Sequence, residues 1–462
     1  MLEILQNGNQ RWGYIMKPKA TQTTVQEDLF RSQLCNIINM RHELVQLGDT
    51  IDWAYLELKV SDFYAEIGRP GTSTRLIVGL HILKQIYHLS DEGICERWVH
   101  DPYFQYFCGE LFFQHHFPME RSVMTHFRQR VGEEFCEVLL QESLHTAYKL
   151  GALETKQVER VVVDTTVQPK AITFPTDAKL RYKAITQLVK LAKAHGVQLR
   201  QSYVRVGKKQ VVASCRYRHA KQMKRARKAE KKLNTYLGRV IRDIKRQIEK
   251  QQELAVYFKK SLGKATHIHT QQKTDTDKIY SWHAPEVECI SKGKAHKPYE
   301  FGCKVSVTTN VNPAPAGHFV LHAKALHGKP YDGHTLNGVL NDIEAQTGIT
   351  IERAYVDKGY RGHQHPKKQR IFMSGQKRGI TATIKKELKR RSVVEPLIGH
   401  LKNEGHLGRN YLHGKTGDVI NALLVGAGYN FKLILRWLKI LFTFFWESFF
   451  QLFWIMQVKT QS

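Results

Sequence analysis

Paired cysteines are missing from this sequence. None of its seven cysteines is spaced as Cys-x-x-Cys, and they are scattered: Cys35, Cys95, Cys108, Cys136, Cys215, Cys289 and Cys303. This pattern speaks against a disulfide framework and against a zinc ribbon. Residues 1–13 also lack the apolar run of a signal peptide. We therefore expect a reduced, cytoplasmic protein.

Acidic residues are scarce relative to basic ones. The 462 residues include 71 lysines and arginines but only 42 aspartates and glutamates, which gives a formal net charge of +29. Such a balance predicts a polyanionic partner and favours nucleic acid over a membrane surface. We expect the protein to associate with the nucleoid.

An uninterrupted apolar run that could cross a membrane is also missing. Residues 412–462 are rich in apolar and aromatic side chains, but Lys432, Arg436, Lys439 and Glu447 interrupt them. A transmembrane helix needs about 18 or more largely uncharged residues. The sequence favours C-terminal helices used for packing or oligomerisation, with no stable membrane insertion; membrane association is the alternative.

The periodicity of apolar residues changes along the chain. Helical spacing dominates residues 1–150, which we expect to form an all-helical domain. Strand-like runs in residues 151–177 and 296–411 predict a catalytic core with a mixed, interrupted α/β sheet. Residues 178–295 are expected to be a basic helical insertion and a loop.

Two apolar strands are predicted to end in an aspartate. Three valines precede Asp164, and the run 349–356 precedes Asp357. A fully apolar strand indicates burial on both faces, and a carboxylate there is costly without a partner. Because ligands gather at strand ends in open α/β sheets, these two acids are candidates for a binding site.

A predicted helix late in the chain supplies a third carboxylate. Glu395 shares one face of it with Arg391, one turn earlier, and Lys402, two turns later. Alone, this pattern fits a surface helix with an ion pair. Together with Asp164 and Asp357 it indicates a site for Mg²⁺ or Mn²⁺, because such ions prefer carboxylate oxygen. Two ions about 3.5–4 Å apart can catalyse phosphoryl transfer.

A basic helix predicted from Ser122 is a candidate DNA contact. Ser122 would cap this helix, and Arg128 and Arg130 lie on it. A DNA-reading helix and a helix that packs on its neighbours with a basic outer side fit the pattern equally well.

A second basic run is predicted to lie on long helices of the insertion. It extends from Arg216 to Lys228 and includes Arg225 and Arg227. A solvated charged face is the usual explanation for such a run. Its strongly one-sided charge favours contacts with backbone phosphates.

The chain resembles bacterial insertion-sequence transposases of the IS-five family. The motifs that carry the resemblance are Val162-Val163-Asp164-Thr165-Thr166, Phe174-Pro175-Thr176-Asp177, Pro330-Tyr331-Asp332-Gly333-His334-Thr335-Leu336, Asp357-Lys358-Gly359-Tyr360 and Arg391-x-x-x-Glu395 with Lys402. The resemblance covers nearly the whole chain. It implies a DDE transposase with an RNase H-like core, in which Asp164, Asp357 and Glu395 are the catalytic acids and bind two Mg²⁺ ions.

The resemblance also implies partners and an activity. The all-helical domain of residues 1–150 would bind DNA ends. Arg391 and Lys402 would contact terminal DNA, and we expect Lys358 to contact DNA as well. The partners would be double-stranded transposon ends and target DNA, held by a homodimer. The reaction would be hydrolysis at the ends followed by transfer of the 3′-hydroxyls to the target. The alternatives are an RNase H-like nuclease without strand transfer and a non-catalytic DNA-binding descendant.

Two positions depart from this scheme or compete within it. Leu388 stands where the family signature has a tyrosine, so the resemblance does not carry over a DNA contact by that tyrosine, whereas the three catalytic acids are unaffected. Asp332, in a turn before a helix, is the rival for the second catalytic aspartate. An acid at that position is a normal helix cap, whereas the predicted strand end favours Asp357.

Overall fold

The computed structural model describes residues 15–17, 31–65, 69–249, 252–291, 298–363, 365–366 and 370–459, with the side chains of the last helix described up to Thr443. Residues 1–13, where we expect no signal peptide, lie outside these ranges. The chain divides into two compact units. Unit 1 contains Met1–Gln168, Lys304–Asn410 and Thr416–Ser462, and unit 2 contains Pro169–Cys303 and Tyr411–Lys415.

Unit 1 begins with a group of helices, as the helical spacing of its apolar residues predicts. They are α1 (Leu34–Ile37), α2 (Glu43–Thr50), α3 (Trp53–Ser61), α4 (Thr74–Ile86), α5 (Asp91–His100), α6 (Pro102–Phe107), α7 (Ser122–Lys149) and α8 (Thr155–Val158). The two-residue strands β1 (Ile15–Met16) and β2 (Arg69–Pro70) pair in parallel. Large apolar side chains such as Trp98, Phe104 and Phe107 are fully buried among these helices.

Helix α7 differs from the short basic helix that the sequence predicts. It spans 28 residues, and its N-cap is Arg121, without a side-chain cap. The predicted cap at Ser122 is therefore wrong, because Ser122 is already helical. Gly132, with φ of +60°, interrupts the helix, a conformation that glycine adopts without steric cost. Most of α7 is a packing helix of the unit.

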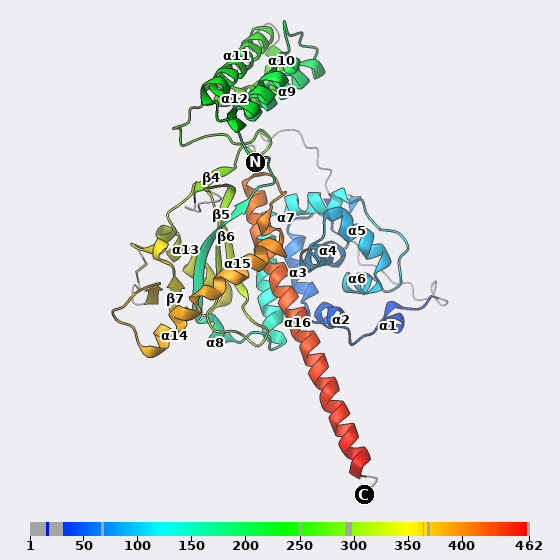
Figure 1. Ribbon diagram of the computed structural model, residues 1–462. Helices are drawn as coiled ribbons and strands as arrows, with labels where there is room; N and C mark the ends of the chain where they lie inside the picture. The colour runs from blue at the N-terminus through cyan, green and yellow to red at the C-terminus, as the bar shows by residue number, and fades with distance from the viewer. Residues whose placement is uncertain are drawn as a thin grey trace. The chain divides into compact units, whose positions relative to one another are not determined.

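A curled, mixed sheet has the strand order β4-β5-β3-β7-β8, and β6 pairs with β5 on a branch (Figure 1). Most of this sheet belongs to unit 1, whereas β4 and residues 299–303 of β5 belong to unit 2. The strands are β3 (Arg160–Pro169), β4 (Glu288–Ser291), β5 (Tyr299–Asn310), β6 (Val320–Leu326), β7 (Arg353–Val356) and β8 (Ile371–Met373). β3, β7 and β8 run parallel, whereas β4, β5 and β6 are antiparallel. The expected mixed α/β fold is confirmed.

Two predicted strand ends need correction. Asp164 lies in the middle of β3, because the β-branched residues after it extend the strand to Pro169. The run 349–356 forms a strand only from Arg353, since the residues before it have no partner in the sheet. Asp357 does follow its strand directly.

Helices of unit 1 cover the sheet and bury its apolar face. They include α13 (Asp332–Thr347), α14 (Ala382–Arg390), α15 (Val394–Asn403) and the short 3-10 helices η2 (Lys358–Tyr360), η4 (Arg391–Val393) and η5 (His406–Gly408). Val394, Leu397 and Leu401 of α15 are buried, as the spacing predicts. The helix expected around Glu395 is broken at η4, so Arg391 precedes α15 rather than lying on it.

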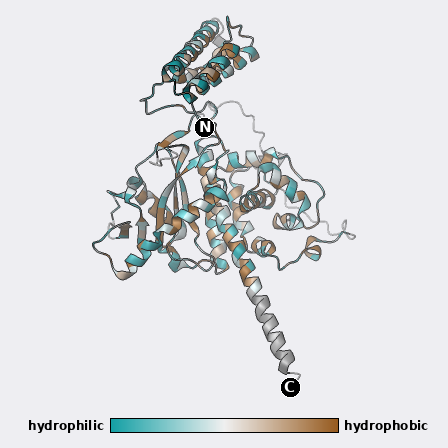
Figure 2. Ribbon diagram, viewed as in Figure 1, coloured by the Kyte–Doolittle hydropathy of each residue, from teal (hydrophilic) through white to brown (hydrophobic). Residues whose placement is uncertain are grey.

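A single long helix replaces the several C-terminal helices that the sequence predicts. α16 runs from Gly414 to Lys459. Its part Gly414–Thr443 is long and apolar enough to cross a membrane, but 83% of the apolar window is buried inside the structure. Asn430 on this helix donates to Ser143 and to the Val320 carbonyl. Figure 2 shows how hydrophobic and hydrophilic residues alternate along the helices of the unit.

Unit 2 contains four helices with a core of their own. They are α9 (Asp177–Ala194), α10 (Val204–His219), α11 (Met223–Ile248) and α12 (Gln252–Thr270). Their buried face includes Leu188, Leu237, Ile244 and Phe258. α10 and α11 form a hairpin that carries the basic run at its turn. Lys170 and Glu286 of the same unit form an ion pair of 3.1 Å.

Candidate active site

The pairing of β3 with β7 places two aspartates side by side. Val162 is the register partner of Tyr355. Asp164 and Asp357 each lie two residues further along their chains, and Asp357 keeps an extended backbone, with φ of −80° and ψ of 179°. Neighbouring strands lie about 4.8 Å apart, and residues two apart share a face of the sheet. The two carboxylates therefore project from adjacent positions on one face.

Helix α15 brings the glutamate to the same face. Val162, Tyr355 and Val394 belong to one buried apolar cluster, so the first residue of α15 packs on the face from which both aspartates project. Glu395 follows Val394 at the start of the helix, and its side chain is 64% exposed. A carboxylate near a helix N-terminus is stabilised by the helix dipole.

The side chain of Arg391 links the first acid to the third. Its Nη1 lies 3.8 Å from an oxygen of Asp164, and its Nη2 lies 3.4 Å from an oxygen of Glu395. The Arg391 side chain is only 15% exposed. One cation between two carboxylates relieves the repulsion that these would otherwise exert on each other. Asp164 and Glu395 therefore converge at one position that attracts positive charge.

A buried hydroxyl faces the same acids. Tyr360 is 1% exposed, and its hydroxyl has no hydrogen-bond partner in the part of the chain that the structure describes. Burial raises the pKa of Tyr360 well above its usual value, and the negative charges of Asp332, Asp164 and Asp357 raise it further. A buried hydroxyl without a partner costs about 1–3 kcal/mol.

The turn after β7 fixes the direction of Asp357. Its carboxylate accepts a hydrogen bond of 2.8 Å from the backbone N–H of Gly359 and caps η2. A Cβ at Gly359 would lie 2.9 Å from the same oxygen, so glycine is needed for this approach. Lys358 is exposed beside the pair and extends along Gly375.

The rival aspartate lies at the margin of the site. Asp332 is the first residue of α13, and its side chain makes no cap. The expected capping role is wrong, because the carboxylate forms an ion pair of 3.1 Å with Lys304 instead. Its other oxygen would lie 3.6 Å from a Cβ at Gly359, which brings Asp332 close to the Asp357 turn. The choice of Asp357 over Asp332 remains a prediction.

A buried carboxylate joins the elements that carry the site. Glu387 on α14 is 3% exposed and forms ion pairs with Arg160 of β3, at 3.2 Å, and with Arg353 of β7, at 2.8 Å. The Tyr355 hydroxyl also donates to it. Leu388 also packs against the apolar cluster of Val162. These contacts fix α14 across the two strands that carry the aspartates.

The donor set fits a hard divalent cation. Carboxylate oxygens from Asp164, Asp357 and Glu395 are the ligands that Mg²⁺ and Mn²⁺ prefer. The Arg391 guanidinium already neutralises part of this negative charge, because it lies beside both Asp164 and Glu395. The three acids supply the oxygen atoms that such an ion prefers, but their ligand atoms do not all lie within 4.8 Å of one another, so an ion site here remains a prediction.

The predicted DNA contacts are distributed unevenly. Arg128 is buried and forms a bidentate pair with Asp91, at 3.0 and 2.6 Å, which speaks against its predicted contact with DNA. The Arg130 guanidinium lies 5.1 Å from the centre of the Tyr64 ring. Lys402 is half-buried near the end of α15. Arg225 and Arg227 are exposed at the start of α11. DNA binding by these last four residues remains a prediction.

Sequence reasoning missed three features of the site. Tyr360 belonged to a recognised motif, but only its burial beside the acids shows why a tyrosine is placed there. The ion pair of Lys304 with Asp332 joins residues 28 apart. The contact of Arg391 with Asp164 depends on the packing of α15 on β3. A local pattern could have signalled Tyr360 alone.

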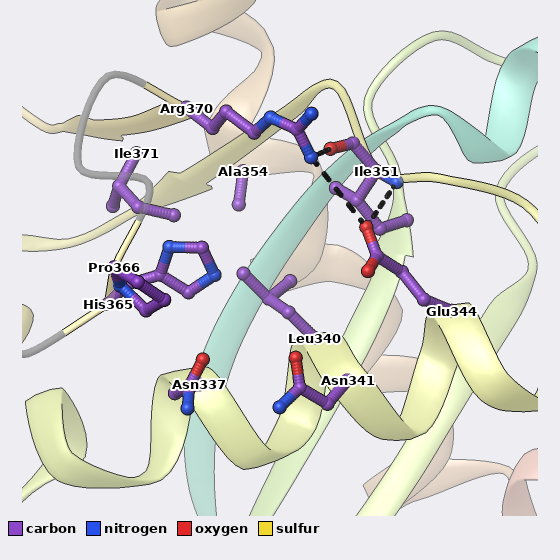
Figure 3. Close-up of a pocket in the computed structure, with 10 residues that line it drawn as sticks. All are labelled: Asn337, Leu340, Asn341, Glu344, Ile351, Ala354, His365, Pro366, Arg370 and Ile371. Carbon is purple, nitrogen blue, oxygen red and sulfur yellow. Dashed lines mark hydrogen bonds and ion pairs between the residues drawn. The ribbon is translucent and has the colours of Figure 1, made fainter.

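A separate small cavity lies between α13 and the strands β7 and β8 (Figure 3). Its volume is about 70 Å³, and Asn337, Leu340, Ala354 and Ile371 help to line it. In Figure 3, Arg370 reaches the carbonyl of Ile351, at 3.1 Å. The cavity has room for a few water molecules only, and none of the candidate catalytic acids lines it.

Two comparisons relate this chain to known proteins. Residues 32–130, which span α1 to the first part of α7, match the family described as Transposase domain (DUF772). The chain is also similar to "Uncharacterized protein ORF8 in nfe locus" of Rhizobium meliloti, at 50% identity over 195 residues. That match covers 42% of this chain and 94% of the relative. No solved structure matches significantly. This chain therefore belongs to the same family as the rhizobial protein, and it carries a transposase domain in its N-terminal part.

Proposed function

We propose that this protein is a DDE transposase, which cuts DNA at the ends of its element and joins them to a target. The observation that carries the proposal is the convergence of Asp164, Asp357 and Glu395 on one face of the β3–β7 pair, in a chain with a transposase domain. The mixed sheet with these acids is compatible with an RNase H-like core. The net charge of +29 supports DNA as the substrate.

The chain's own residues have distinct roles in this proposal. Bound Mg²⁺ or Mn²⁺ would supply activation of the attacking hydroxyl and stabilisation of the leaving oxygen. Asp164 and Asp357 project from strands of the sheet and provide the fixed part of the ligand set. Glu395 is exposed and can adjust to the substrate. Arg391 would grip a phosphate with its planar fork, and Lys402, about 10 Å beyond Glu395 along α15, would act as a point charge.

The same phosphoryl-transfer chemistry serves both cleavage at the element ends and joining to the target. Water attacks the phosphodiester at an element end and leaves a free 3′-hydroxyl. That hydroxyl then attacks a phosphodiester of the target, and one new bond replaces the bond that breaks. Two ends must be joined to one target, so we propose a homodimer that holds both on double-stranded DNA in the nucleoid.

The proposal is tested with duplexes that carry the DNA flanking the gene. Asp357→Asn should abolish Mg²⁺-dependent cleavage and leave binding of the duplex largely intact, because the fold keeps its shape while a ligand oxygen is lost. Asp164→Asn should do the same. Asp332→Asn is the matched comparison and should still cut.

Each other outcome has a defined meaning. Cutting by Asp357→Asn, together with no cutting by Asp332→Asn, would transfer the second catalytic position to Asp332. Cleavage without joining of the 3′-hydroxyls to target DNA would identify an RNase H-like nuclease. Binding without any cleavage by the parent protein in Mg²⁺ or Mn²⁺ would refute the enzymatic proposal.

A further inference from the structure

One face of α10 in unit 2 carries a row of basic side chains. Arg205, Lys208, Lys209 and Arg216, which we call the α10 stripe, are spaced so that they share one side of the helix. Together with neighbouring side chains they line a shallow surface hollow of about 600 Å³. The residues that line it are Arg205, Lys208, Lys209, Val212, Ala213, Arg216 and Tyr217.

No cation of the α10 stripe forms an ion pair with an acid of the described residues. α10 contains no aspartate or glutamate. Within the described residues, Arg218 is the α10 cation that pairs with an acid, Glu230, at 2.7 Å. Four cations held without counter-charge repel one another, and an external anion relieves this repulsion.

The opposite side of α10 fixes the direction of the stripe. α10 packs against α9 and α11 (Figure 1). A Cβ at Gly207 would lie 3.2 Å from the ring of Tyr182, which shows how closely the helix approaches α9. The Ser214 hydroxyl donates to Glu230 on α11, at 2.8 Å. Because this side is packed, the helix cannot rotate, and the stripe stays directed away from the core of the unit.

The composition of the stripe favours DNA over a lipid surface. A membrane-bound basic helix needs a broad apolar face of large side chains. Among the residues that line the hollow, Val212 is the exposed large aliphatic one, and its relative exposure is 43%. From Arg205 to Arg216 the stripe extends about 16 Å along the helix axis, which matches roughly five base pairs of duplex.

We propose that the α10 stripe binds the phosphate backbone of duplex DNA without reading its sequence. The inference rests on the proposed function in that DNA is the substrate of the catalytic acids. It adds a surface on unit 2 that retains DNA independently of those acids. Because the contacts are to phosphates, binding should depend steeply on salt and little on base sequence.

The test uses the full-length protein and a duplex of arbitrary sequence, about 30 bp long, without divalent metal. The variant Arg205→Gln/Lys209→Gln/Arg216→Gln removes three cations and keeps good helix formers. Affinity is measured over a range of KCl concentrations. The slope of log affinity against log salt should fall by about 2.7, since each lost phosphate contact removes about 0.9.

A matched variant separates a local surface from net charge. Lys183→Gln/Lys190→Gln/Lys193→Gln removes three exposed cations from α9 of the same unit, and it should leave the slope close to that of the parent. An equal fall in both variants, or no fall in the α10 variant, would overturn the inference. If the α10 variant instead loses binding to vesicles of anionic lipid and keeps its slope on DNA, the stripe is a membrane surface.

The result is independent of the catalytic proposal. Binding is measured without metal, so Asp357→Asn should show the slope of the parent. If the parent protein never cleaves DNA but the α10 variant has a smaller salt dependence of binding, phosphate binding by the α10 stripe is supported and only the enzymatic function is refuted. A protein that cleaves normally with an unchanged slope refutes only the stripe. Circular dichroism of each variant should match the parent.

Discussion

Arg391 controls the charge balance of the candidate site at the scale of single residues. It lies within 4 Å of both Asp164 and Glu395 and is mostly shielded from solvent. A guanidinium in this position offsets two negative charges, and it can also offer two parallel donors to a phosphate. These two uses compete, so the side chain must leave at least one carboxylate when it grips DNA.

Replacing Arg391 should therefore affect cleavage more than folding. Arg391→Ala should slow cleavage at the element end about 10- to 100-fold, which corresponds to the roughly 1.5–3 kcal/mol of a charge-assisted hydrogen bond. Arg391→Lys should rescue only part of this rate, because it restores charge without the planar fork. Single-turnover rates, with a footprint of the end complex, measure the effect.

Lys402→Ala provides the comparison for this series. Lys402 lies two turns after Glu395, and as a point charge it should contribute less than Arg391. If Arg391→Ala cleaves at the parental rate with an unaltered footprint, η4 and α15 have a structural role only.

A histidine pair in unit 1 predicts a dependence of stability on pH. The rings of His88 and His406 stack with centroids 4.3 Å apart, and His406 approaches the Leu89 carbonyl. The pKa of His406 is lowered to about 4, mainly because the ring is buried. The charges of His88 and Lys84 lower it further, whereas the Leu89 carbonyl and Asp91 raise it. The ordinary value is 6.5.

The sign of the effect follows from proton uptake. Between pH 6.5 and about 4 the unfolded chain binds a proton at position 406 that the folded chain does not. The stability contributed by neutral His406 is therefore complete above pH 6.5 and is lost as the pH falls toward 4. Urea unfolding at several pH values should show a shallower decline for His406→Gln than for the parent. His116→Gln, at an exposed position, should show the parental decline.

At the scale of elements, sequence reasoning located the strands and helices better than their ends. Spacing alone predicted that Leu336, Val339, Leu340 and Ile343 are the buried side of one helix, and they are. It misplaced the end of β3, because the residues after Asp164 favour strand equally well and only pairing decides where a strand stops. The convergence of acids from β3, β7 and α15 follows from strand register, which no local pattern specifies.

Glu387 should prove to be a structural acid whose loss weakens the sheet. Glu387→Gln leaves Arg160 and Arg353 without their buried partner, and we expect the free energy of unfolding to fall by about 3 kcal/mol. Glu352→Gln removes another partner of Arg160, but one that is 50% exposed, and should cost less than about 1 kcal/mol. Chemical denaturation of the two variants makes the comparison. Equal losses would show that burial does not distinguish these two ion pairs.

At the scale of the whole molecule, the chain combines one acidic site with a large excess of positive charge. The candidate acids lie in unit 1, whereas the helices of unit 2 are rich in lysine and arginine. The composition predicts a polyanionic partner, but it cannot say which cations are available to contact one. Burial removes Arg128 from that set, and helix packing exposes Arg205 and Arg216.

The arrangement of unit 2 has a consequence for how the chain folds. The N–H of Lys170 donates to the Phe301 carbonyl, at 3.0 Å, so the two ends of the insertion meet although about 130 residues separate them. Helices that contact their neighbours in sequence form quickly. When unit 2 forms first, the chain between β3 and β5 behaves as a short loop, and closing it costs roughly 3 kcal/mol less than closing a flexible one of full length. We expect the pairing of β3 with β7, which brings Asp164 and Asp357 together, to form later than unit 2, because it joins residues far apart in the chain.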